Sequence, residues 1–320
     1  MTDRPIFMTG AAGFIGSRLA NRLLQQGHAV VGLDNFNDYY DPKLKRRNVA
    51  WALEQPQFTL IEADLRDADA MLELAKRYQP AAVAHLAAMA AVRYSVQHPL
   101  VYGQVNVQGT MNLLDAMRQV GQPRIVIAST GSVYGSSTPV PFVEDAAADR
   151  PLAPYPASKR AMEMMVHAYH HIWQLPTTIL RFFNVYGPHG RPDMMPWHWT
   201  KQILAGETLS LYDAGKLKRD WTYVDDIVDG FVAALEADHD FEIINLGCGR
   251  PVANVDFIRV LERLLGKKAV TTDVPCPPSE PKITYADITK ARRLLGYEPK
   301  VAVETGLARF IDWMRAEKLL

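Results

Sequence analysis

Cysteine is scarce in this chain of 320 residues, with Cys248 and Cys276 as the only two thiols. They are too few and too scattered for a disulfide framework or a metal cluster, so we expect no metal and a reducing, cytoplasmic location. No apolar run approaches the roughly 18 residues of a membrane span, and Met1 leads into the first expected strand without a charged and then apolar leader. These absences argue against export and against a place in the membrane.

An excess of charge of one sign is also missing, because 35 basic side chains balance 35 acidic ones. This balance gives no reason to expect nucleic acid or an acidic membrane surface as a partner. The chain is 48% hydrophobic and 22% charged, which suits a soluble globular protein of one large domain or two coupled domains. It contains no internal repeat and no low-complexity tract.

The most informative stretch, residues 6–34, is a glycine-rich turn and a helix between two short apolar runs. Its string Thr9-Gly-Ala-Ala-Gly-Phe-Ile-Gly16 predicts a βαβ unit, in which Gly10, Gly13 and Gly16 let the backbone approach a pyrophosphate. The amides at the start of the helix, around Phe14 and Ile15, then face the phosphates. Asp34 ends the second run, where it can accept a hydrogen bond from a ribose 2′-hydroxyl and would repel a 2′-phosphate. We therefore expect NAD rather than NADP.

Strands and helices are expected to alternate without a break up to residue 183. Apolar runs at 58–64, 82–88, 124–130 and 177–183 predict strands, and the segments leading to residue 54, at 99–120 and from 155 onward predict helices. This alternation favours an α/β fold with a doubly wound parallel sheet of the Rossmann type. Ligands gather at the carboxyl ends of such strands. The further candidate cofactor residues are Asn35, Asn37, Asp64, Leu65, Leu86, Ala87, Ala88 and Ser129, with Asn106 reaching inward from its helix. His85 is expected to be a packed strand residue.

Beyond Asn184, glycine and proline interrupt the pattern, and we expect a change of domain there. The cofactor-binding domain is predicted over 1–183, with 222–248 returning to it through a last strand at 241–245. A smaller, mostly helical substrate-binding domain is predicted over 184–221 and 249–320. We expect a helix that opens at 216–226 and runs through 236, and others near 255–265, 287–295 and 304–317.

Tyr155 and Lys159 are four residues apart at a helix start, so both side chains project from one face. A phenol with a pKa near 10 is a poor base at neutral pH, but a nearby ammonium and a positively charged nicotinamide ring favour the phenolate. Tyr155 is therefore the candidate proton acceptor, and Lys159 can also donate to ribose hydroxyls. Thr130 can share a hydrogen bond with the same substrate hydroxyl. The spacing by itself also fits two side chains on an ordinary helix surface without a catalytic role. The βαβ unit and the hydroxyls at 129–130 make a catalytic role the favoured interpretation.

Taken together, these segments resemble the extended short-chain dehydrogenase/reductase family, in its nucleotide-sugar epimerase and dehydratase branch. The motifs cover nearly all of the chain, at 9–16, 85–88, 128–135, 155–159, 181–188 and 218–226. Within the branch, the strings at 34–45, 91–95 and 190–194 are similar to those of UDP-glucuronate 4-epimerases. The resemblance implies NAD-dependent C4 epimerisation of a UDP-sugar through a 4-keto intermediate, with Tyr155 as the base. It also implies a homodimer formed through the helices that start near 99 and at 155.

The resemblance further suggests roles for residues of the substrate site. Asn184 and Arg219 match positions that grip the sugar diphosphate, and Ser132 is expected at the reacting sugar. Dehydratases carry an Asp-Glu pair where this chain has Gly131 and Ser132, and decarboxylases carry Glu in place of Ser132. An acid for a second proton transfer is missing here, which favours simple epimerisation.

Arg191 is the candidate clamp for a C6 carboxylate, since a guanidinium fork matches a carboxylate in a bidentate way. A 4-keto uronic acid is a β-keto acid that loses CO2 when its carboxylate stands perpendicular to the carbonyl plane, so an epimerase must restrain this group. UDP-glucuronate is thus the first choice of substrate. Two departures from the glucuronate epimerases leave alternatives open: Asn184 stands where they usually carry Thr, and Pro278-Ser-Glu-Pro281 replaces a Gln-Pro-Gly-Asp loop. The alternatives are a UDP-glucose or UDP-N-acetylglucosamine 4-epimerase, a UDP-glucuronate decarboxylase and a non-catalytic NAD-binding regulatory protein.

Overall fold

The computed structural model describes residues 4–277 and 280–320. Met1, before which we expect no leader, and Pro278 and Ser279 of the loop that departs from the family pattern lie outside the described residues. Among the helices in the described ranges, none combines the length and the apolar character needed to cross a bilayer.

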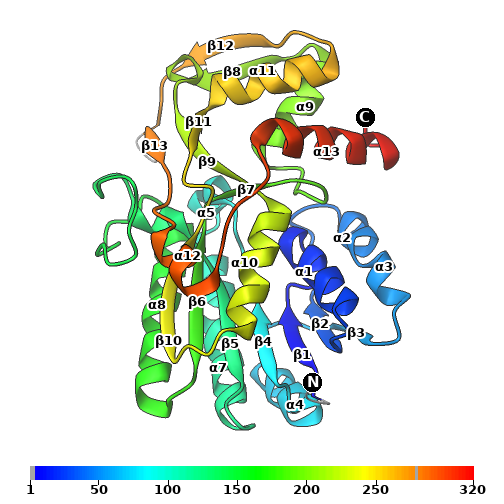
Figure 1. The fold of residues 1–320 in the computed structure, drawn as a ribbon, viewed down its shortest axis with the longest axis vertical. Coiled ribbons are helices and arrows are strands. Elements are labelled where there is room, and N and C mark those ends of the chain that lie inside the picture. Colours follow the sequence, from blue (N-terminus) through cyan, green and yellow to red (C-terminus); the bar gives the residue numbers. More distant parts are fainter. Residues whose placement is uncertain (1–3, 278–279) are drawn as a thin grey trace.

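A parallel sheet of seven strands forms the lower half of the molecule in Figure 1. Its order is β10-β6-β5-β4-β1-β2-β3, and every neighbouring pair is parallel. The strands are β1 (Ile6–Thr9), β2 (Val30–Asp34), β3 (Phe58–Glu62), β4 (Ala82–His85), β5 (Arg124–Thr130), β6 (Thr177–Phe182) and β10 (Phe241–Leu246). The strand order reverses between β1 and β4, which defines the topological switch point of a Rossmann-type sheet. The predicted fold class is confirmed.

Helices cover both faces of this sheet because its strands carry apolar side chains on both sides. Met8 packs into the core shared with α1 (Phe14–Gln25) and α10 (Val224–Glu236), which lie side by side in Figure 1. The adjacent Phe7 packs on the opposite face, with α4 (Ala68–Tyr78), α7 (Thr110–Arg118) and α8 (Pro154–Trp173). Such two-sided burial is typical of parallel sheets, whose strands read as continuous apolar runs.

The smaller part lies above the carboxyl ends of the large sheet (Figure 1) and contains two small sheets with their helices. One sheet contains β7 (Asn184–Tyr186), β9 (Lys218–Tyr223), β11 (Pro251–Ala253) and β13 (Ile283–Thr284), and the other pairs β8 (Thr208–Tyr212) with β12 (Val270–Val274). The helices of this part are α9 (Met195–Ala205), α11 (Asn254–Leu265) and α13 (Val303–Ala316), whereas α12 (Thr289–Leu295) contacts β10 and α10 beside the large sheet. The last of the predicted strands, β10, pairs with β6 and so returns to the large sheet. The division into two domains at the predicted residues stays a prediction.

Three predicted elements differ from the structure. Residues 218–223 form strand β9 before α10 begins at Val224, because β7, β11 and β13 supply pairing partners that no local pattern reveals. The helix expected at 99–120 is helical without a gap from 99 to 118, but it comprises α6 (Pro99–Tyr102), a π-helical segment (Gly103–Gly109) and α7. The helix expected to end near residue 54 is divided into α2 (Pro42–Asn48) and α3 (Ala50–Leu53) at the buried Val49. A short helix not predicted, α5 (Val92–Gln97), lies beside α8.

Candidate active site

The glycine turn borders a cavity of about 340 Å³ at the switch point between β1 and β4. Gly10 has a φ of +71°, and a Cβ there would come within 2.7 Å of the Ala87 nitrogen. A Cβ on Gly16 would lie 2.0 Å from the Gly10 oxygen. Helix α1 starts at Phe14 with no side-chain cap and no acidic residue in its first turn, which leaves its first amides to an anionic ligand. This arrangement suits the pyrophosphate of a dinucleotide.

Asp34 stands at the end of β2 and is almost completely buried. Its Oδ2 accepts a hydrogen bond from the Ala12 amide at 3.1 Å, and its Oδ1 accepts one from the Phe36 amide at 2.9 Å. The Lys45 ammonium lies 3.8 Å from Oδ1. Burial lowers the pKa of Lys45, and the negative charge of Asp34 opposes this shift. The backbone therefore holds the Asp34 carboxylate at the position predicted for ribose recognition.

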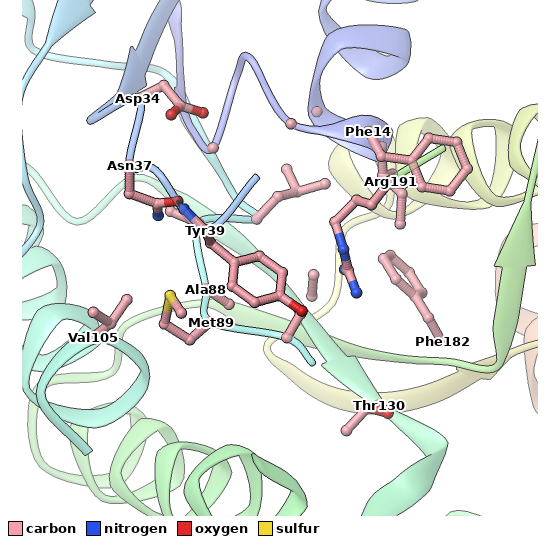
Figure 2. Close-up of a pocket in the computed structure, with 18 of the residues that line it drawn as sticks. Phe14, Asp34, Asn37, Tyr39, Ala88, Met89, Val105, Thr130, Phe182 and Arg191 are labelled. Carbon is pink, nitrogen blue, oxygen red and sulfur yellow. Dashed lines mark hydrogen bonds between the residues drawn. The ribbon is translucent and has the colours of Figure 1, made fainter. Parts of the chain in front are cut away.

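The structure places nearly all the predicted cofactor residues around this one cavity. They are Gly10, Gly13, Phe14, Ile15, Gly16, Asp34, Asn35, Asn37, Asp64, Leu65, Leu86, Ala87, Ala88, Ser129, Tyr155 and Lys159. Figure 2 shows Asp34 and Asn37 on one side of it and Phe14, Phe182 and Arg191 on the other. Asn106 is the exception, because it is fully buried and does not line the cavity. Its amide bonds both the N–H and the carbonyl of Met89 at 2.9 Å, so it positions a lining residue instead.

Tyr155 and Lys159 lie in the first turns of α8, and both side chains border the cavity. Burial raises the pKa of Tyr155, while a hydrogen bond with Thr130 and the positive charge of Arg191 oppose the rise. Burial lowers the pKa of Lys159 to about 8, and Glu163 acts against this lowering. The Lys159 ammonium donates to the Ala128 carbonyl at 2.9 Å. Arg191 is thus a cation acting on Tyr155 that the spacing of Tyr155 and Lys159 did not predict.

A buried ion pair between Glu163 of α8 and Arg181 of β6 was not predicted. Glu163 accepts two hydrogen bonds from Arg181, at 2.7 and 3.0 Å, and one from the Ser129 hydroxyl at 2.6 Å. The signal in the sequence is the position of Glu163, four residues after Lys159, on the same helix face. His85 is packed as predicted, between the hydroxyls of Thr9 and Thr110 at 2.7 and 2.9 Å.

A second cavity of about 620 Å³ adjoins the first and extends into the smaller part of the molecule. It is lined by all five predicted substrate residues, Thr130, Ser132, Asn184, Arg191 and Arg219. The first four also line the dinucleotide cavity, so they mark the junction of the two spaces. At the far end, Arg219 is buried and donates to Glu280 at 2.9 Å. The second cavity therefore leads from the far end to the junction, beside Tyr155 of the first cavity.

Two further residues, Tyr39, which lines both cavities, and Asp193, which lines the second, were not predicted as site residues. The Arg191 guanidinium donates through two nitrogens to the two carboxylate oxygens of Asp193, at 2.9 and 3.0 Å. The Tyr39 hydroxyl donates to the same carboxylate at 3.0 Å. In Figure 2 the side chains of Tyr39 and Arg191 converge on the middle of the cavity from opposite sides. Arg191, predicted to bind a substrate carboxylate, is thus already paired with a carboxylate of the protein itself, that of Asp193.

Comparisons with known proteins agree with this geometry. The model of the NAD dependent epimerase/dehydratase family matches residues 6–247. A UDP-glucuronate 4-epimerase of Thermodesulfobacterium geofontis is 41% identical over 309 residues, which cover 96% of this chain and 95% of that protein. UDP-glucuronate 4-epimerase 4 of Arabidopsis thaliana is 42% identical over 326 residues, or 96% of this chain and 74% of that protein.

Solved structures give the same picture. UDP-glucuronic acid 4-epimerase from Bacillus cereus, in complex with UDP-glucuronic acid and NAD, has a TM-score of 0.92 and 36% identity, covering 98% of this chain and 99% of that chain. A tyrosine-to-phenylalanine variant of that enzyme is known with a 4-deoxy-4-fluoro analogue and NAD. UDP-glucose 4-epimerase from Thermotoga maritima, with UDP-glucose, has a TM-score of 0.90 and 29% identity, with coverages of 98% and 99%. By its sequence motifs, its sheet topology and these matches, the chain belongs to the NAD-dependent epimerase/dehydratase family.

Proposed function

We propose that this protein is an NAD-dependent UDP-glucuronate 4-epimerase, which interconverts UDP-glucuronate and UDP-galacturonate. The observation that carries the proposal is the position of Arg191 beside Tyr155, at the junction of the dinucleotide cavity and the second cavity. In a hexuronic acid the C6 carboxylate is attached to C5, the neighbour of the reacting C4. A guanidinium next to the base is therefore where a sugar carboxylate would need its partner.

The residues at the junction suit a proton transfer at the C4 hydroxyl. Tyr155 takes the hydroxyl proton, and Thr130, already hydrogen-bonded to Tyr155, shares the substrate oxygen. With a pKa of about 8, Lys159 is mostly protonated at neutral pH and favours the phenolate. NAD would be held by the glycine turn and Asp34, where it would accept the C4 hydride and give it back to the opposite face of the 4-keto sugar. Tyr155 returns the proton in this second half, so hydride and proton are both restored and the reaction involves no net oxidation.

The loop after β5 supports epimerisation over elimination or decarboxylation. A Cβ on Gly131 would lie 2.8 Å from the Phe183 ring, so an acidic side chain fits there only if that ring moves. Ser132 lines both cavities and offers a hydroxyl but no second acid. Arg191 and Ser132 together would keep the sugar carboxylate away from the perpendicular alignment that expels CO2.

The test is an incubation of the purified protein with UDP-glucuronate and no added cofactor, followed by separation of the nucleotide sugars. We expect UDP-galacturonate and neither a UDP-pentose nor CO2. Tyr155→Phe should lower kcat by orders of magnitude while leaving nucleotide binding nearly unchanged, because it removes only the proton acceptor. Near-normal turnover of this variant would contradict the assigned role, and a pentose product would replace the epimerase by a decarboxylase.

A second candidate, a 4-epimerase of neutral UDP-hexoses, is favoured by one residue. Asn184 lines both cavities at a position where the sequence follows the neutral-sugar epimerases. The discriminating variant is Arg191→Ala, tested with UDP-glucuronate and UDP-glucose in parallel. Loss of the parent's preference for the acid in this variant supports the first proposal, whereas a parent protein that turns over UDP-glucose and not UDP-glucuronate supports the second candidate.

We also propose that the protein acts as a cytoplasmic homodimer. Leu100 on α6 is 81% exposed and Met164 on α8 is 61% exposed, and these two helices contact each other. Large apolar side chains exposed together favour a protein partner, and a second copy of this chain supplies a matching surface. Light scattering at micromolar concentration should give the mass of a dimer; a monomer would count against the proposal.

A further inference from the structure

Asp193 occupies an unusual place for a carboxylate, in the second cavity and against the cation expected to bind the substrate. Arg191 lines both cavities, and its fork is engaged with Asp193 through two parallel hydrogen bonds of 2.9 and 3.0 Å. Burial acts to raise the pKa of Asp193, but the charge and hydrogen bonds of Arg191 and the bond from Tyr39 outweigh it and lower this pKa. Asp193 is therefore ionised at neutral pH.

The third member of the cluster, Tyr39, comes from a distant part of the chain. It lies in the loop after β2, whereas Asp193 precedes α9 in the smaller part of the molecule. The Tyr39 hydroxyl donates to Asp193 Oδ2 at 3.0 Å, and its ring packs edge-on against Tyr94 with 4.8 Å between the ring centroids. Tyr39 and Tyr94 both line the second cavity. Asp193 thus has two partners, Arg191 and Tyr39, and both face the space that the sugar would enter.

We propose that Asp193 is a specificity-determining residue, an internal carboxylate that competes with the C6 carboxylate of the substrate for the fork of Arg191. The inference rests on the proposed function, because it requires a substrate that carries this group. A planar guanidinium offers this bidentate edge to one carboxylate at a time. An acidic sugar therefore binds by exchange, in which one guanidinium–carboxylate pair breaks and another forms, and Asp193 keeps its bond with Tyr39.

This exchange affects acidic and neutral sugars differently. A UDP-hexose that carries a hydroxyl at C6 leaves the Arg191–Asp193 pair intact and neither gains nor loses a charge pair. UDP-glucuronate gains a pair at Arg191 but displaces Asp193 and brings a second negative charge near it, which weakens its binding. Asp193 hence reduces the affinity for the acid, which helps the product, also an acid, to leave after each turnover.

The test uses Asp193→Asn, which keeps the size of the side chain but removes the competing charge. Affinities for UDP-glucuronate, UDP-glucose and UDP are measured by calorimetry on the NAD-loaded protein in a Tyr155→Phe background, where no turnover disturbs binding. We expect roughly tenfold tighter binding of UDP-glucuronate, which corresponds to about 1.4 kcal/mol, and no change for the other two ligands. Asp193→Glu, which restores the charge, should bind UDP-glucuronate like the parent. Tyr39→Phe, which removes one hydrogen bond but no charge, should give a smaller gain.

The outcomes separate this inference from the proposed function. The inference alone is overturned if the parent protein binds UDP-glucuronate and a folded Asp193→Asn variant binds it equally or more weakly. Asp193 would then serve to orient Arg191. An equal gain for UDP would also overturn it, since UDP carries no sugar carboxylate. A parent that epimerises UDP-glucose and fails to bind UDP-glucuronate overturns both.

Discussion

The buried carboxylate of Glu163 is predicted to control the upper pH limit of the reaction. Glu163 lies one helical turn after Lys159 and is 1% exposed. Its negative charge opposes the burial that lowers the pKa of Lys159 to about 8. Glu163→Gln removes this charge, so the pKa of Lys159 should fall further. Activity requires the ammonium and is lost as the pH rises through this pKa, and the alkaline limb of the pH–rate profile should therefore move to lower pH.

The size of the shift follows from the helix geometry. Side chains four residues apart on a helix are separated by about 6 Å. Two unit charges at this separation interact by about 2.8 kcal/mol at an effective dielectric constant of about 20, which corresponds to about 2 in pKa. The other ionisable groups near Lys159 include Tyr155 on the same helix, the neutral His85 on β4, and the two partners of Glu163, Arg181 on β6 and Arg160 on α8. Since Arg181 already offsets part of the charge of Glu163, we expect a shift of roughly one to two, from near pH 8 to between about 6 and 7.

The assay is the initial rate of epimerisation from about pH 5 to 10, measured for the parent, Glu163→Gln and Glu163→Asp. The Asp variant keeps the charge and should keep the alkaline limb near that of the parent. The Gln variant leaves Arg181 without its counter-charge, at a cost of about 3–5 kcal/mol in the free energy of unfolding, so its fold is checked by circular dichroism. An alkaline limb that stays in place in folded Glu163→Gln would refute the reasoning. If this variant does not fold, a large shift in Glu163→Asp, which retains the charge, would refute it as well.

Three other predictions concern the cofactor site and the buried histidines. Gly16→Ala would bring a Cβ to 2.0 Å from a backbone oxygen and should abolish NAD binding in equilibrium dialysis, whereas Gly103→Ala, which meets no atom within 4 Å, should bind NAD like the parent. Burial lowers the pKa of His85 to about 3 and that of His189 to about 4. Below about pH 6.5 the unfolded chain therefore binds more protons than the folded chain. As the pH is lowered from about 6 to 4, urea titrations should show the free energy of unfolding falling by about 1.4 kcal/mol per pH unit for each histidine. A His189→Asn variant with an undiminished slope would contradict this. Asp34→Ala removes the carboxylate that repels a 2′-phosphate and frees Lys45, 3.8 Å away, to attract one, so the ratio of NADP to NAD affinity should rise at least about tenfold, and an unchanged ratio would argue against this role of Asp34.

Local sequence patterns were sufficient where neighbours along the chain decide the structure. The glycine string and the two apolar runs around it specify the βαβ unit, since turn geometry, helix packing and strand burial all depend on nearby residues. Residues four apart on a helix lie on the same face, so the side chains of Tyr155 and Lys159 border one cavity. The ends of parallel strands meet at one edge of the sheet, and Asp34, Asp64, Ala88 and Ser129 were therefore predicted as lining residues without coordinates.

Contacts between distant parts of the chain required the tertiary structure. Residues 218–223 were predicted as the start of a helix but form strand β9. The strand pairs with three short strands, one before it and two after it in the chain, and the local sequence does not show these partners. Asn106 was predicted as a cofactor residue that reaches inward; it does so to the backbone of Met89, and only the structure shows that it does not line the cavity itself. The sequence by itself determined the strands of the sheet, the glycine turn and the pairing of Tyr155 with Lys159 on one helix face, because each follows from local periodicity and spacing. Only the folded chain brought Tyr39 to Asp193, since no local pattern encodes a contact between residues 154 positions apart.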